Sequence, residues 1–239
     1  AAASYEARKY GVHSAMPTAT AIRHCPHGIV IKPRFDRYRE VSGQVMAIFH
    51  QMTELVEPLS LDEAYLDVTH LVEAGQNPRV IAESLKRRVK EEVGLNLSVG
   101  ASTGKSISKI ASDLRKPNGL VVVPPGYESR FLAPLPVGKL SGIGPKSVEL
   151  LRQDNIETIE QMAAQPFNWY LRHFGKRARS VWNRARGEDQ EPVRIHRPTK
   201  SLSSESTFPN DLSNPNTLYQ ELAGLSSRVA RNLAEKDLQ

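Results

Sequence analysis

Two adjacent acidic residues, Asp62 and Glu63, form the pattern in this chain with the clearest chemical potential. They open the segment 60–69, whose apolar residues alternate as in a half-buried strand: Ala64, Leu66 and Val68. Carboxylates packed against a buried strand are costly unless something compensates their charge. Mg²⁺ is one such partner, because phosphoryl-transfer sites hold it with one or two carboxylates together with substrate phosphates. The alternative interpretation is a solvated turn in front of a strand.

The backbone decides whether both carboxylates can serve one site. Neighbouring residues of a regular strand point to opposite faces. Asp62 and Glu63 can therefore reach the same metal site only if the chain bends at the start of the strand, near Pro58 and Ser60. Asp67, further along the same strand, is left outside the predicted site.

A second pattern, Gly142-Ile-Gly144, lies between two helical patterns and is typical of a helix-hairpin-helix. Glycines let the backbone approach a phosphate, and exposed N–H groups at a helix N-terminus bind anions. Lys146 adds positive charge. Such contacts position DNA without reading its sequence. A Gly-x-Gly by itself is weak evidence, and it is strengthened here by flanking apolar residues: Leu140, Val148, Leu150 and Leu151.

The segment 60–69 resembles the second catalytic motif of Y-family (translesion) DNA polymerases, the bacterial DNA polymerase IV (DinB-like) type in particular. Three more segments resemble motifs of that family in the family's order: 3–12 its fingers motif, 109–119 its palm motif near the incoming nucleotide, and 140–146 its thumb hairpin. Together they cover about residues 1–190, and the ordered set is far more specific than any one motif.

The resemblance implies an enzyme that synthesises DNA on a template by nucleotidyl transfer, with low fidelity, in DNA damage bypass and repair. It implies two Mg²⁺ ions, with Asp62 bridging both and Glu63 completing the ion near the primer end. It also implies contacts to the triphosphate of a deoxynucleoside triphosphate and contacts to primed template DNA: Tyr5, Arg8 and Lys116 for the first, Gly142, Gly144 and Lys146 for the second.

Relative to the family, we expect the chain to be truncated at both ends. The family's N-terminal segment carries the first metal-binding aspartate and an aromatic steric gate, so we expect residues 1–239 to be inactive by themselves. A non-catalytic DNA-binding protein that uses the hairpin and keeps a relic palm is the competing hypothesis. Asp62 and Glu63 favour the enzyme, because a protein that only binds DNA needs no metal carboxylates.

The surrounding patterns predict an α+β fold. Apolar spacing predicts helices over 38–55, from Pro78 to Gly94, and over 107–114, and strands within 57–69, 95–101 and 120–123. This alternation predicts a palm with a mixed or antiparallel sheet and helices on one face. Residues 137–187 read as short helices, 188–199 as a linker, 201–208 as a strand and 218–233 as a helix.

The expected domains are partial fingers (1–34), palm (35–123), an all-helical thumb (124–190), a linker (191–199) and a partial little finger (200–239). The net charge of +6 fits a polyanionic partner. The single cysteine, Cys25, excludes an internal disulfide and favours the cytoplasm. No apolar run approaches the roughly 18–20 residues of a membrane span. We expect a monomer, with a sliding clamp as a further candidate partner through a segment beyond residue 239.

Overall fold

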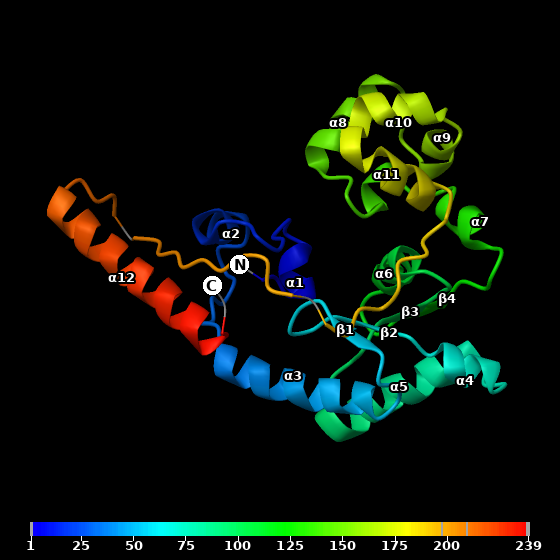
Figure 1. Ribbon diagram of the computed structural model, residues 1–239, viewed down its shortest axis with the longest axis horizontal. Coiled ribbons are helices and arrows are strands. Elements are labelled where there is room, and N and C mark those ends of the chain that lie inside the picture. The colour runs from blue at the N-terminus through cyan, green and yellow to red at the C-terminus, as the bar shows by residue number, and fades with distance from the viewer. Residues whose placement is uncertain (1, 197, 209, 238–239) are drawn as a thin grey trace.

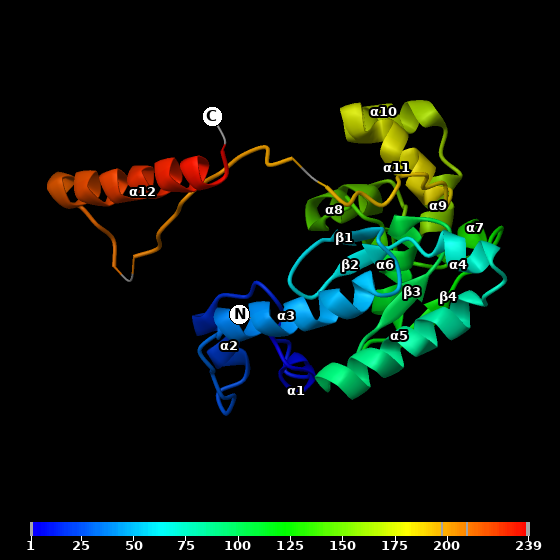
Figure 2. The same cartoon turned by 60° about the horizontal axis from the view of Figure 1, so that its bottom comes forward.

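The computed structural model describes residues 2–196, 198–208 and 210–237. Figures 1 and 2 show a central body of strands and helices, a group of short helices beside it, and one long C-terminal helix that extends away from both. The α+β class predicted from the sequence is confirmed. Among the described residues no helix combines the length and the apolar character needed to cross a membrane.

Two small sheets lie at the centre of the body. Strand β1 (Val56–Pro58) pairs antiparallel with β2 (Ala64–Leu66), and β3 (Val99–Ala101) pairs parallel with β4 (Leu120–Val122). The sequence predicts a mixed or antiparallel sheet, and the structure contains one antiparallel and one parallel pair among the described residues. In the part of the chain that the structure describes, no strand connects these two pairs. The four strands therefore form two separate two-stranded sheets.

Helices α3 (Phe35–His50), α5 (Pro78–Val93) and α6 (Lys105–Leu114) surround these strands. The sequence predicts α5 well because its ends carry strong signals. Asn77 caps the helix by accepting a 2.9 Å hydrogen bond from the Arg79 N–H, Pro78 occupies the first turn, and Gly94 ends the helix with a left-handed φ of 78°. Its apolar stripe is buried as expected: Ile81, Ala82, Leu85 and Val89.

The helical segment 124–187 contains α7 (Glu128–Leu132), η1 (Val137–Lys139), α8 (Pro145–Gln153), α9 (Ile159–Ala163), α10 (Phe167–Phe174), η2 (Gly175–Arg177) and α11 (Ala178–Ala185). The largest apolar core runs from Ile107 and Ile110 of α6 through Leu132 of α7 into these helices. A smaller core joins α3, β1 and α5 around Phe49 and Val56. A continuous core therefore joins the short helices to the central body. The domain boundaries expected from the sequence stay predictions.

Four shorter or peripheral helices complete the structure: α1 (Tyr5–Arg8), α2 (Thr18–His24), α4 (Thr69–Glu73) and α12 (Pro215–Glu235). The last of these confirms the helix predicted over 218–233. The strand predicted over 201–208 is wrong, because no described residue of that segment is in a strand. A strand is stable only beside a paired neighbour, and neither of the two sheets pairs with this segment.

Gly100 in β3 gives a testable consequence of how closely α6 packs on this strand. A Cβ atom at Gly100 would lie 2.0 Å from the Ser108 carbonyl oxygen and 2.5 Å from the Ser112 nitrogen, both backbone atoms of α6. We expect Gly100→Ala to lower the free energy of unfolding by about 1–3 kcal/mol or more, as in overpacked cores. Urea unfolding measures it. Gly43→Ala in α3, where a Cβ meets nothing within 4 Å, is the control and should stabilise slightly. Equal stability of the two variants would contradict this packing argument.

Candidate active site and DNA-binding surface

Asp62 and Glu63 lie in the loop of the β1–β2 hairpin rather than inside a regular strand. The Leu59 and Ser60 N–H groups donate to the Glu63 carbonyl oxygen over 2.8 and 3.3 Å, which bends the chain back just before β2. The bend that a shared metal site requires is therefore present at the predicted position. Asp62 is exposed, and its Oδ1 accepts a 2.6 Å hydrogen bond from the Ser60 hydroxyl.

Lys109 of α6 contacts the second carboxylate. Its ammonium group donates to Glu63 Oε1, and both side chains are about one-third exposed, at 32% and 36%. Lys105, one turn earlier on α6, pairs with Glu57 of β1 at 2.9 Å. Both ammonium groups thus bind carboxylates of the β1–β2 hairpin. Their (i, i+4) spacing on one helix face was the available signal.

Lys116 lies close to the same loop. The hydrogen bond to Asp113 raises the pKa of Lys116; burial opposes this effect, and the charges of Asp113, Glu63 and Tyr5 reinforce it. The Lys116–Asp113 distance is 2.5 Å. Lys116 thus lies within electrostatic range of Glu63 and of Tyr5, which come from two other segments.

Tyr5 and Arg8 share helix α1, as their spacing suggests. The Arg8 guanidinium lies 5.9 Å from the centre of the Tyr5 ring. Arg8 also donates to the Ala3 carbonyl oxygen (3.2 Å) and to the Ser14 hydroxyl (3.3 Å), which fixes its orientation at this end of the chain. Both side chains are accessible to a ligand, since Tyr5 is 49% exposed and Arg8 is exposed as well.

Lys86 of α5 holds the turn that follows Lys116. Its ammonium group donates to the Leu97 carbonyl oxygen and to both the carbonyl and the side-chain oxygen of Asn118, all at 2.7 Å. Burial lowers the pKa of Lys86. The sequence carries no signal for this role of Lys86, because a lysine on a helix with many charges looks like an ordinary solvated residue.

The donor set decides whether a metal fits here. Two adjacent carboxylates are the number that Mg²⁺ uses at phosphoryl-transfer sites, where phosphate oxygens and waters complete the coordination. Asp62 and Glu63 therefore fit the protein part of one such site. Over residues 2–196, 198–208 and 210–237, no group of three or more His, Cys, Asp or Glu side chains is placed to hold a metal by itself.

The hairpin Gly142–Gly144 lies between η1 and α8. Ile143 is buried, while both glycines and Lys146 are exposed. Gly142 has a φ of 91°, which favours glycine, and its carbonyl oxygen accepts a 3.2 Å hydrogen bond from Arg177 of η2. Gly144 caps α8, and a Cβ there would meet nothing within 4 Å. The buried Ile143 thus anchors a loop that leaves the backbone at the start of α8 open to a ligand.

Comparison with known proteins shows which family the chain is similar to. The model of the impB/mucB/samB family matches residues 1–113, and the model of that family's C-terminal domain matches residues 199–239. DNA polymerase IV of Alkalilimnicola ehrlichii is 44% identical over 238 residues, which cover 100% of this chain and 67% of that protein. DNA polymerase IV of Staphylococcus epidermidis is 43% identical over 231 residues, which cover 97% of this chain and 65% of that protein. The chain thus spans about two thirds of the length of these relatives.

Solved structures show the same similarity in three dimensions. DinB from Sulfolobus solfataricus superposes with a TM-score of 0.73 at 32% identity, over 79% of this chain and 56% of that one. An insertion ternary complex of Dbh DNA polymerase superposes with a TM-score of 0.72 at 31% identity, over 79% and 56% of the two chains.

Proposed function

The chain belongs to the Y family of DNA polymerases, in its DNA polymerase IV (DinB-like) branch, and on that premise we propose that it takes part in template-directed DNA synthesis of the low-fidelity, translesion type. The reaction is nucleotidyl transfer from a deoxynucleoside triphosphate to a primed template. The observation that carries the proposal is the bent β1–β2 loop, which holds Asp62 and Glu63 together and in which Lys109 of α6 binds Glu63.

In the proposed reaction, the primer 3′-hydroxyl oxygen attacks the α-phosphorus of the nucleotide. The hydroxyl gives its proton to solvent, and the bond from the α-phosphorus to the bridging oxygen breaks, so that pyrophosphate leaves. Arg8 and Lys116 bind the triphosphate as a rigid fork and a mobile charge, and Tyr5 adds a neutral donor. These cations also stabilise the negative charge that develops on the leaving group.

Asp62 and Glu63 are the residues that would hold the metal, and we propose that two Mg²⁺ ions bind at this site. When bound, such ions stabilise the attacking and leaving oxygens and favour deprotonation of the attacking hydroxyl. Glu63 is held by Lys109 in the structure, so we propose that this ammonium group orients the carboxylate toward the site. A monomer in the cytoplasm, with a sliding clamp as a further partner, remains part of the proposal.

Primer extension by the intact gene product tests this function. A labelled primer on an undamaged template, and on a template with an abasic site, should be extended only when Mg²⁺ and deoxynucleotides are present. Duplex DNA binding is measured on the same preparation. Tight DNA binding without any extension would favour the competing hypothesis of a non-catalytic DNA-binding protein.

The hairpin at the start of α8 gives a separate prediction. We expect Gly144→Val to weaken binding of duplex DNA about tenfold or more, since loss of one hydrogen bond to a charged phosphate costs about 1.5–3 kcal/mol. The variant should fold normally, because Gly144 has an ordinary φ of −88° and open space around it. Fluorescence anisotropy over a salt series measures the effect, and Gly43→Ala in α3 is the control. DNA affinity equal to that of the parent at every salt concentration would show that the hairpin has no role in binding.

A further inference from the structure

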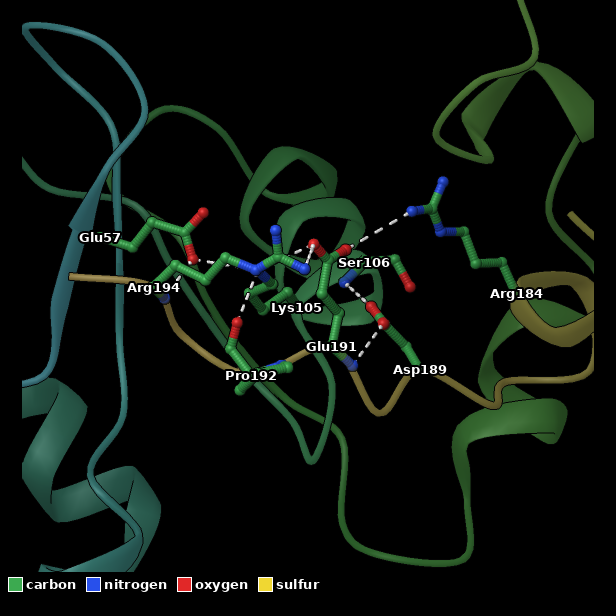
Figure 3. A network of polar contacts seen from close by, with 8 residues as sticks. All are labelled: Glu57, Lys105, Ser106, Arg184, Asp189, Glu191, Pro192 and Arg194. Atoms are coloured by element: carbon green, nitrogen blue, oxygen red, sulfur yellow. Dashed lines mark hydrogen bonds and ion pairs between the residues drawn. The ribbon is translucent and has the colours of Figure 1, made fainter. Parts of the chain in front are cut away.

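The segment that leaves α11 does not hang free, although its polar composition predicts a linker. Residues 188–194 run back along the start of α6 and make polar contacts with it and with β1, as Figure 3 shows. Gly187, which precedes them with a φ of 81°, is packed so closely on α7 that a Cβ there would lie 2.8 Å from Glu128 Cβ and 3.0 Å from the Ser129 nitrogen. The path of the chain is therefore already constrained where the segment begins.

Asp189 caps helix α6 from a distant part of the sequence. Its Oδ2 accepts a 2.6 Å hydrogen bond from the Ser106 N–H, and its Oδ1 accepts one of 3.3 Å from the Glu191 N–H. The N-cap residue of α6 is Gly104, which has no side chain to make this contact. A Cβ at Gly104 would lie 2.9 Å from both the Cβ and the carbonyl oxygen of Asp189. Because glycine has no side chain, Asp189 has room to pack at this position.

The ionisation of Asp189 agrees with this capping role. Burial by itself would raise the pKa of Asp189, but hydrogen bonds from Ser106 and Glu191 and the charge of Arg184 outweigh burial and hold the pKa below its usual value. The carboxylate is therefore charged at neutral pH, which is the form that binds best to the N-terminus of a helix.

The backbone of the same segment contributes to a buried ion pair. Glu57 of β1 is buried, with 0% of the residue exposed, and its Oε2 accepts 2.9 Å hydrogen bonds from the Lys105 ammonium group and from the Arg194 N–H. Lys105 donates a further 2.9 Å hydrogen bond to the Pro192 carbonyl oxygen. Figure 3 shows the segment running beside this pair. The main chain of the segment thus supplies one hydrogen-bond donor and one acceptor to these buried charges. Loss of either hydrogen bond would leave a buried charged group less well compensated, which costs free energy.

Glu191 connects the segment to the last helix of the thumb. Its carboxylate lies 3.3 Å from Arg194, and it lies 3.8 Å both from Lys105 of α6 and from Arg184 of α11. Side chains from the segment therefore reach α6 and α11 at the same time.

We propose that residues 187–194 form a rigid strap that ties the end of α11 to α6 and β1. The flexible part of the connection to α12 then begins only after Arg194. The strap adds a second, polar connection to the apolar core that already joins the short helices to the central body. It makes the DNA-binding hairpin and the carboxylate loop move as parts of one unit, and it assigns Asp189 and Glu57 to positioning rather than chemistry.

Hydrogen exchange followed by mass spectrometry on the whole chain tests the strap without any need for activity. The amides of Ser106, Glu191 and Arg194 should exchange at least about a hundredfold more slowly than those of the open segment 198–208. Asp189→Ala should remove this protection, whereas Asp189→Asn should keep it, because an asparagine oxygen also caps helices. Glu188→Ala is the matched control, since the Glu188 carboxylate pairs with the exposed Arg186 nearby. Equal exchange of 187–194 and 198–208 in the parent would overturn the proposal.

Spin labels measure the distance between the central body and the short helices. This distance distribution would not change in Asp189 variants if Asp189 had only a local role. Labels at Glu83→Cys on α5 and Glu149→Cys on α8, with the buried Cys25 replaced by Ser, report the distance between the body and the short helices. We expect a narrow distribution in the parent and in Asp189→Asn, and a broader one in Asp189→Ala. An unchanged distribution in Asp189→Ala would overturn the claim that the strap couples the two parts.

Discussion

Replacing Asp62 or Glu63 by Ala in the intact gene product should reduce primer extension by about 10²–10³-fold or more while leaving duplex DNA affinity nearly unchanged. These carboxylates would hold metal charge that acts mainly on the transition state, so their loss lowers the rate of nucleotide incorporation with little effect on the ground state. Single-turnover incorporation of one nucleotide, together with the dissociation constant for primed DNA, separates the two effects.

Asp67→Asn is the matched control for these variants. Asp67 lies just after the same strand, but its carboxylate accepts a 2.9 Å hydrogen bond from the Thr69 N–H at the start of α4, which an asparagine can also accept. Extension by the control should match the parent. If Asp62→Ala or Glu63→Ala retained extension within tenfold of the parent, the assignment of the metal site would be wrong.

The sequence predicted those structural features whose signals are local. The bend before Glu63 follows from Pro58 and Ser60, and α5 follows from its apolar stripe and from residues that mark its two ends. These features depend on neighbours within a few residues, so a single sequence contains the information. The four ordered motifs then indicated which segments should contribute to the site, and Lys116 lies within electrostatic range of Glu63 and of Tyr5.

The contacts that the sequence did not predict join residues far apart in the chain. Lys109 and Glu63 are separated by 46 positions, Lys105 and Glu57 by 48, and Ser106 and Asp189 by 83. Periodicity tells which face of a helix is polar, but it does not say whether that face meets solvent, DNA or a carboxylate. For the same reason, the polar composition of 188–194 suggested a free linker when its charges in fact bind the body.

Lys105→Met should destabilise the protein far more than the loss of an exposed ion pair would. The change leaves the Glu57 carboxylate buried without its ammonium partner, and removing one member of a buried ion pair costs about 3–5 kcal/mol. It also removes the donor to the Pro192 carbonyl oxygen and so weakens the strap. We therefore expect the midpoint of urea unfolding to fall sharply while the dependence of the free energy on urea concentration stays the same.

Lys109→Met, one turn later on the same helix, is the control that isolates burial as the cause. Its ion pair with Glu63 is about one-third exposed, and pairs of that kind contribute about 0–1 kcal/mol. The double variant Glu57→Gln with Lys105→Met should recover much of the lost stability, because it removes both buried charges and keeps an oxygen that can accept from the Arg194 N–H. If Lys105→Met and Lys109→Met were equally mild, Glu57 would have to obtain its compensation elsewhere, and the strap would lose its anchor.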